Sequence, residues 1–181
     1  MSRRSLLIAA ALVLAGCAST TVDPAAKRRE IDGKVDNALA ELQRSASVKE
    51  LVDRAAGVLV VPDVVTAGFI VGGSYGQGAL RKKGQTAGYY SLGAGSAGLL
   101  AGAQSKSVFM LFMTEEALRK FEQSNGWTVG GDASVALVNV GADGRVDTQT
   151  ARSEVIGLVR NQSGFMANLS LEGTKFNRLQ L

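Results

Sequence analysis

The glycine run from Gly93 to Gly98 is the part of this sequence that most closely matches a ligand-binding pattern. The run reads Gly-Ala-Gly-Ser-Ala-Gly, follows a strand-like segment, and is followed by Glu115 at roughly the acidic spacing of dinucleotide sites. Such a site also needs a helix directly after the glycines, to receive the phosphates. Gly102 lies in the middle of that segment, and a glycine costs about 1 kcal/mol in a helix interior. We therefore interpret the run as bent strand, with dinucleotide binding as the alternative.

Two carboxylates have types and positions that would allow acid–base chemistry. Asp132 follows a glycine pair and Glu172 precedes Gly173, each near the end of an expected strand. The alternative, which we favour, is that Asp132 organises a turn and Glu172 is solvated or paired. The segment from Gly68 to Gly73 has the P-loop spacing, but Ser74 stands where the phosphate-binding lysine is required.

The composition does not support catalysis by the common nucleophilic triads and dyads or by metal sites built from cysteine and histidine. The sequence has no histidine and one cysteine, so Ser-His-Asp triads, Cys-His dyads and zinc sites of the Cys/His type are excluded. We expect a protein that is not an enzyme and that uses no metal or cofactor.

The single cysteine lies where a secretory signal would end. Arg3 and Arg4 precede an apolar run, and Leu14-Ala15-Gly16-Cys17 follows it and resembles a bacterial lipobox. The run is shorter than the roughly 20 residues of a spanning helix. We expect residues 1–16 to be removed as a signal peptide and Cys17 to carry lipid, palmitate included. The alternative is a cleaved signal with an incidental cysteine.

This interpretation predicts a location and limits the partners. The chain would be a lipid-anchored protein of the bacterial cell envelope, and Ala18 after the cysteine favours the outer membrane, facing the periplasm. The formal net charge of +4 includes two arginines of the signal, and no run of five like charges occurs, which argues against nucleic acid. The basic cluster Arg81-Lys82-Lys83 lies at an expected hairpin tip. It is our candidate contact for anionic lipid, with a solvated tip that discourages edge pairing as the alternative.

The elements that must position these residues follow from the hydrophobic spacing. Residues 17–29 are expected to form a flexible tether, and residues 30–181 one domain. A helix is predicted from Glu30 and a second over residues 48–56, with Ser47 and Glu50 as a capping box and Gly57 at its end. A mid-chain helix is predicted after Thr114.

Strands are predicted for most of the remaining chain. The expected segments are 58–61 (stopped by Pro62), 68–80, 86–92, 98–103, 107–113, 133–140, 154–160 and 165–171. Because the turns between them are short, neighbouring strands should pair antiparallel. The fold class predicted is α+β: an antiparallel, strongly bent sheet or partly closed barrel, with N-terminal helices and one mid-chain helix.

The chain from Gly57 onward resembles the SYLF-domain family, a lipid-binding module. The stretches that carry the resemblance are GVLVVPDVVTAGFIVGGSYGQGAL (57–80), YYSLGAGSAGLLAGAQSKSVFMLFMTEEAL (89–118), WTVGGDASVALVNVGADG (127–144) and GFMANLSLEGTKFNRL (164–179). The resemblance implies binding of membrane lipid, an anionic phospholipid or a phosphoinositide-like head group, without enzymatic activity. An envelope structural or adaptor protein that binds another protein, through a partner not identified by the sequence, is the alternative. The actin-linked role of eukaryotic relatives does not suit a bacterial envelope.

Overall fold

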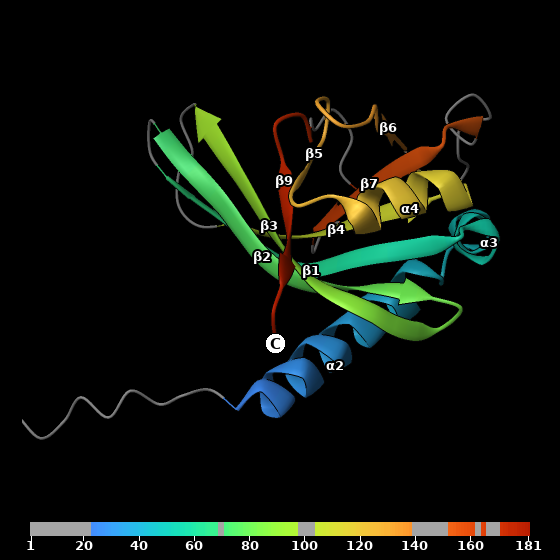
Figure 1. The fold of residues 1–181 in the computed structure, drawn as a ribbon, viewed down its shortest axis with the longest axis horizontal. Coiled ribbons are helices and arrows are strands. Elements are labelled where there is room, and N and C mark those ends of the chain that lie inside the picture. Colours follow the sequence, from blue (N-terminus) through green and yellow to red (C-terminus); the bar gives the residue numbers. More distant parts are fainter. Residues whose placement is uncertain (1–22, 69–70, 98–103, 139–151, 162–163, 166–170) are drawn as a thin grey trace, which may run out of the picture.

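The computed structural model describes residues 23–68, 71–97, 104–138, 152–161, 164–165 and 171–181. A strongly curled sheet carries two helices on its outer face and one on its inner face (Figure 1). The predicted α+β class with a bent, partly closed sheet is confirmed.

The N-terminal helix begins earlier than the hydrophobic spacing indicates. Helix α2 runs from Pro24 to Leu42, and the Asp23 side chain caps it by accepting a hydrogen bond from the Ala25 N–H at 3.0 Å. Proline suits the first helical position because it lacks an N–H that would go unpaired there. Residues 24–29, which we assigned to the tether, are therefore helical.

The second helix is also displaced from its predicted bounds. Helix α3 runs from Ala46 to Arg54 with Ser45 at its N-cap position, so the capping box that we placed at Ser47 does not begin it. Gly57 does not close the helix but begins the first strand.

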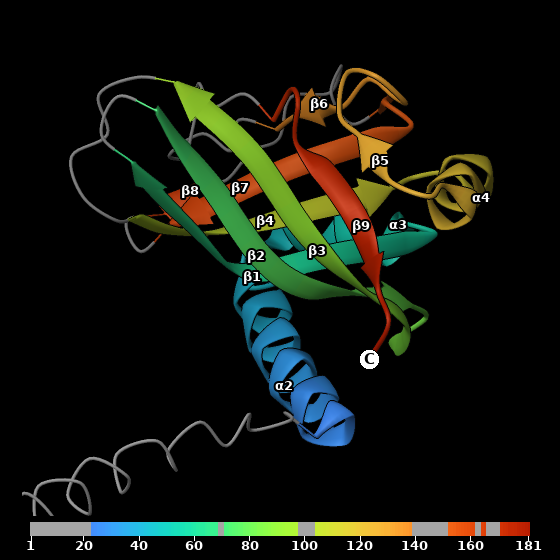
Figure 2. The ribbon, with the colours of Figure 1, turned by 60° about the vertical axis from the view of Figure 1, so that its left-hand side comes forward.

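In the described residues the sheet has nine strands. They are β1 (Gly57–Gly68), β2 (Val71–Lys82), β3 (Gln85–Ala97), β4 (Gln104–Phe112), β5 (Trp127–Thr128), β6 (Ala136–Leu137), β7 (Val155–Asn161), β8 (Gly164–Phe165) and β9 (Lys175–Leu179). The spatial order is β5-β9-β3-β2-β1-β4-β7-β6, with β8 beside β7. All pairs of strands are antiparallel except β6 with β7, which is parallel. Figure 2 shows how the long central strands cross the curled sheet.

The sheet bends at Pro62, where we expected the first strand to stop. Strand β1 continues through the proline because its register with β4 shifts between Val61 and Val64. A proline lacks the ladder donor, and a bulge is one of the few places in a sheet that tolerates it. On the neighbouring strand, a Cβ added to Gly78 would stand 1.9 Å from the Val60 carbonyl oxygen. The bend therefore requires glycine at position 78.

Two apolar cores lie on the two faces of the sheet. The inner core holds α4 (Glu115–Gln123) and the aromatic residues of the curled sheet, and Phe121 lies at its centre. Its ring centroid is 4.7–6.3 Å from those of Tyr90, Phe112, Trp127 and Phe176. The outer core packs α2 and α3 on the convex face through Ile31, Val35, Leu42, Val48 and Leu51. The sheet thus has few uncovered apolar side chains.

Other strand predictions were partly correct. The hairpins β2–β3 and β7–β8 form as expected, whereas the strand predicted for 133–140 is ordered as β6 only over Ala136–Leu137. Strand β9 was not predicted. The segments 98–103, 139–140 and 166–170 lie outside the described residues. Among the helices that are described, none has the length and apolar character needed to cross a bilayer.

Candidate functional site

The two candidate acid–base carboxylates lie in adjacent surface turns. The Asp132 side chain accepts a hydrogen bond from the Thr128 N–H at 2.6 Å, which closes the turn between β5 and β6. Glu172 is exposed in the next turn, where the Gly173 N–H donates to the Val129 carbonyl at 3.1 Å. Asp132 therefore organises a turn, as we favoured. In the described residues no three acidic, histidine or cysteine side chains gather in a way that could hold a metal ion.

The Gly93–Gly98 run belongs to a strand as far as it is described. Gly93 and Gly95 lie in β3 opposite Tyr75 and Gly73 of β2. An added Cβ at either glycine would meet nothing within 4 Å, so neither backbone closely approaches another group. The predicted bent strand is confirmed for Gly93–Ala97, and Gly98 lies outside the described residues.

The basic cluster at the β2–β3 hairpin does not form one cationic surface. Arg81 is only 8% exposed and contacts α2: its guanidinium donates to the Asp32 carboxylate at 3.0 Å and to the Asp36 carboxylate at 2.6 Å. Lys82 pairs with Glu122 of α4 at 3.0 Å. Lys83 alone is exposed in the turn. The expectation that Arg81 is part of a solvated tip is wrong, because residue 81 falls on the helix-covered face of β2.

Asp32 is the acceptor that holds α2 against the sheet. Besides Arg81, its carboxylate accepts hydrogen bonds from the Thr86 hydroxyl at 2.9 Å and the Tyr89 hydroxyl at 2.8 Å. Partial burial and this bond to a carboxylate raise the pKa of Tyr89 above its usual value. Sequence reasoning missed this cluster because its partners are about fifty residues apart along the chain.

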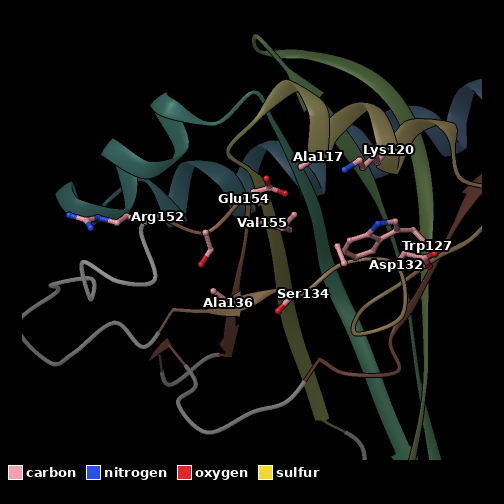
Figure 3. Close-up of a pocket in the computed structure, with 11 residues that line it drawn as sticks. Ala117, Lys120, Trp127, Asp132, Ser134, Ala136, Arg152, Glu154 and Val155 are labelled. Carbon is pink, nitrogen blue, oxygen red and sulfur yellow. The ribbon is translucent and has the colours of Figure 1, made fainter.

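A cleft lies beside α4, and we call it the α4 cleft (Figure 3). Thr114 fixes the start of α4 by accepting a hydrogen bond from the Ala117 N–H at 3.1 Å. The cleft has a volume of about 450 Å³ and lies where the curled sheet brings its two edges, β5 and β6, near each other. Its apolar walls are Ala117, Trp127, Ala133, Ala136 and Val155.

Charged side chains of both signs surround these apolar walls. Lys120 and Arg152 lie on opposite sides of the cleft, with Glu154 between them (Figure 3). Lys120 pairs with Glu116 at 2.9 Å, and this hydrogen bond raises the pKa of the lysine. The arrangement can accept an apolar group against the tryptophan edge and both a negative and a positive group at its rim.

A second hollow lies between the first half of α2 and the β1–β2 hairpin, and we call it the α2 groove. Its volume is about 400 Å³, and its lining combines the charged side chains Lys27, Glu30, Lys34 and Asp63 with apolar residues of the sheet. Val65 and Tyr75 line it and are 47% and 56% exposed.

A third hollow of about 330 Å³ lies near the C-terminal half of α2. Arg160 pairs there with Glu41 at 2.8 Å. Lys106 borders it, and burial lowers the pKa of this lysine. Neither this hollow nor the α2 groove was predicted from the sequence.

A comparison with protein families identifies the C-terminal half of the chain. Residues 93–180 match the profile of the Ysc84 family, described as Las17-binding protein actin regulator. The match assigns this segment to the SYLF-domain family. The predicted resemblance is confirmed for this segment. No curated protein sequence matches the chain.

The matched SYLF segment contains one of the three hollows completely. Every residue that lines the α4 cleft lies within 93–180, whereas α2, the α2 groove and the basic hairpin precede Gly93. The SYLF family is a family of binding domains. The candidate lipid-attachment residue Cys17 lies outside the described residues.

Proposed function

We propose that this chain is a lipid-anchored protein of the bacterial envelope whose SYLF domain binds phospholipid and performs no catalysis. The observation that carries the proposal is the combination of two independent features. The segment Leu14-Ala15-Gly16-Cys17 directly follows a signal-like apolar run, and residues 93–180 belong to a family of binding domains. The first feature brings the chain to a membrane, and the second supplies a domain that binds a partner there.

The α4 cleft is the site that we propose for the lipid. Ala133 and Ala136 are the half-buried apolar residues of its lining, and they supply the apolar surface that an acyl chain or glycerol backbone requires; Ala117, Trp127 and Val155 are buried. Lys120 and Arg152 supply positive charge for a phosphate, and Glu154 supplies negative charge for an ammonium group. A zwitterionic phospholipid head group carries both charges, so it suits this rim better than a purely anionic one.

Intact-mass spectrometry of protein extracted from bacterial membranes tests the anchor. The proposal predicts a mature chain that begins at Cys17 and carries the added mass of acyl groups, and it predicts the same fractionation as outer-membrane markers. The variant Cys17→Ala should carry no acyl mass. A wild-type chain with an unmodified thiol, or with another N-terminus, would contradict the anchor.

Vesicle flotation of the unacylated chain, residues 18–181, tests lipid binding apart from the anchor. The double variant Lys120→Glu, Arg152→Glu should weaken binding to zwitterionic vesicles about thirtyfold, since two lost charge-assisted contacts contribute roughly 1 kcal/mol each. Lys83→Glu is the matched control at the basic hairpin, where we first placed the lipid contact. If the Lys83 variant alone loses binding, the hairpin rather than the α4 cleft holds the lipid.

Protein binding is the second candidate, and the family description favours it, because it names a Las17-binding protein. In a bacterial envelope such a role would be that of an adaptor. It predicts that residues 18–181 bind no vesicle of any composition but form a defined complex with another envelope protein. Crosslinking in cells, followed by the same α4-cleft variants, separates the two roles.

A further inference from the structure

Two neighbouring apolar side chains in the α2 groove are left uncovered. Val65 and Tyr75 are the large hydrophobic residues exposed among those the structure describes, at 47% and 56%. They lie directly opposite each other on β1 and β2, so their side chains project from the same face of the sheet. Exposed apolar residues are normally scattered singly. An adjacent exposed pair beside a groove is therefore a candidate contact surface for a binding partner.

Around this pair, few side chains project from the same face of the sheet. The next pair along the hairpin on the same face is Ala67 with Gly73, and Gly95 lies opposite Gly73 on β3. A Cβ at Gly93 or Gly95 would meet open space. Further along the same face α2 covers the sheet. The uncovered area thus carries few side chains, and Tyr75 is the largest that projects from it.

The charges beside this area are already neutralised within the chain. Lys27 pairs with Glu30 at 3.0 Å, and Lys34 pairs with Glu30 and with Asp63, both at 3.1 Å. Hydrogen bonds from both lysines also hold the pKa of Glu30 below its usual value. A partner of this surface therefore gains little from carrying a net charge.

The position of the proposed anchor indicates which partner this surface contacts. Cys17 precedes the helix cap Asp23 by six residues, and an extended chain spans at most about 3.6 Å per residue, or roughly 22 Å here. Lys27 and Ile31 of the same helix line the α2 groove. A bilayer that holds acylated Cys17 therefore lies within reach of Val65 and Tyr75. Helix α4, which borders the α4 cleft, lies away from the first half of α2 in both views (Figures 1 and 2).

We propose that Val65 and Tyr75 insert into the interface of the bilayer that holds the Cys17 anchor. The contact fixes the orientation of the anchored domain, with the α2 groove facing that bilayer and the α4 cleft open to phospholipid from another surface. The inference rests on the proposed lipid anchor. Tyrosine is enriched at membrane interfaces because its ring is apolar and its hydroxyl is polar. Because the neighbouring cations are paired, the contact requires neither anionic lipid nor low salt.

Site-specific fluorescence on the full acylated chain tests this orientation. Acylation uses the only cysteine, so the substitution Val65→Cys creates one free thiol for an environment-sensitive dye. Glu116→Cys, on the exposed face of α4, is the matched control. The vesicles are made of phosphatidylcholine with a quencher attached to the lipid, and pelleting with the vesicles is measured on the same samples.

The dye at position 65 should shift to the blue and be quenched, and the dye at position 116 should remain in water. Both signals should be unchanged by 1 M salt. Protein that pellets with a water-exposed dye at position 65 overturns this inference and leaves the anchor intact. Protein that does not pellet contradicts the anchor and the inference together. A dye at position 65 that is shielded before vesicles are added, in protein that elutes as a dimer, overturns the inference in favour of a second copy.

An unlabelled double variant gives an independent measurement. Val65→Ser with Tyr75→Ser should weaken vesicle partition of residues 18–181 about tenfold, since two half-exposed apolar side chains would lose their burial. Because both side chains already face water, the variant should fold normally, and its circular dichroism spectrum checks this. Unchanged partition in a folded variant overturns the inference.

Discussion

Removing the Asp32 carboxylate is the perturbation that most sharply tests how α2 is held on the sheet. Arg81, Thr86 and Tyr89 all donate to this one side chain. In Asp32→Ala, the Arg81 guanidinium keeps Asp36 as its remaining carboxylate partner. Only 9% of the Arg81 side chain is exposed. Arg81→Met leaves Asp32 its two hydroxyl donors and removes the buried Arg81 Nε, which has no hydrogen-bond partner.

The two variants should therefore differ in their cost. Three hydrogen bonds to a charged group, each contributing about 1 kcal/mol net, give a loss of roughly 3 kcal/mol for Asp32→Ala. Its carboxylate side chain is 31% exposed, and alanine has the better helix propensity, so we expect about 2 kcal/mol. Arg81→Met should cost about 1 kcal/mol. The double variant should cost less than Asp32→Ala alone, because the nearly buried guanidinium that has lost one of its two carboxylate partners is then absent.

Urea unfolding of residues 18–181 measures these differences with two probes. Trp127 is the only tryptophan and lies in the inner core, whereas circular dichroism reports all the helices, to which the 19-residue α2 on the outer face contributes most. Coincident transitions justify a two-state free energy of unfolding. If Arg81→Met costs as much as Asp32→Ala, or if the double variant is additive, the reasoning about the stranded arginine is refuted.

Three further predictions concern other parts of the fold. Gly78→Ala should cost more than 3 kcal/mol or prevent folding, since its Cβ would overlap the Val60 carbonyl, whereas Gly93→Ala should change stability by less than about 1 kcal/mol. A large loss with Gly93→Ala would contradict the open space beside this glycine. Phe121→Ala should cost about 3–5 kcal/mol in urea unfolding. Lys106→Met should raise the urea midpoint at pH 7, and the gain should shrink as pH approaches 10.5, because the lowered pKa penalises the folded state only while the lysine is charged. A gain that is independent of pH would show that packing alone explains it.

Local pattern was enough to predict the elements that depend on neighbouring residues. The mid-chain helix begins at Thr114 with acidic residues in its first turn, as its sequence indicates. The β2–β3 hairpin forms around Lys83 and Gly84, both with positive φ. The long strand through Pro62 was missed because a bulge depends on register with β4, which the sequence of β1 alone does not contain. The start of α2 was also missed. Asp23 and Pro24 are a typical helix cap and first helical residue, but the hydrophobic spacing that predicted the helix starts only at Ile31.

The candidate site was harder to predict, because it depends on contacts between distant residues. Asp132 could be assigned to a turn from its own neighbours. Arg81 could not be assigned correctly, since its carboxylate partners lie in α2, more than forty residues earlier. The same holds for the α4 cleft, whose opposite sides carry Lys120 and Arg152 only after the sheet has curled. Charge clusters along the chain were therefore a poor guide to charge clusters on the surface.

The central claim is that the SYLF domain itself binds phospholipid, in addition to any anchor at Cys17. Flotation of the unacylated chain, residues 18–181, with phosphatidylethanolamine-containing vesicles tests it most directly. We predict that the protein floats with the vesicles and that Lys120→Glu with Arg152→Glu weakens vesicle binding about thirtyfold, as expected for two lost charge-assisted contacts of roughly 1 kcal/mol each. Protein that stays at the bottom of the gradient with every vesicle composition would contradict it.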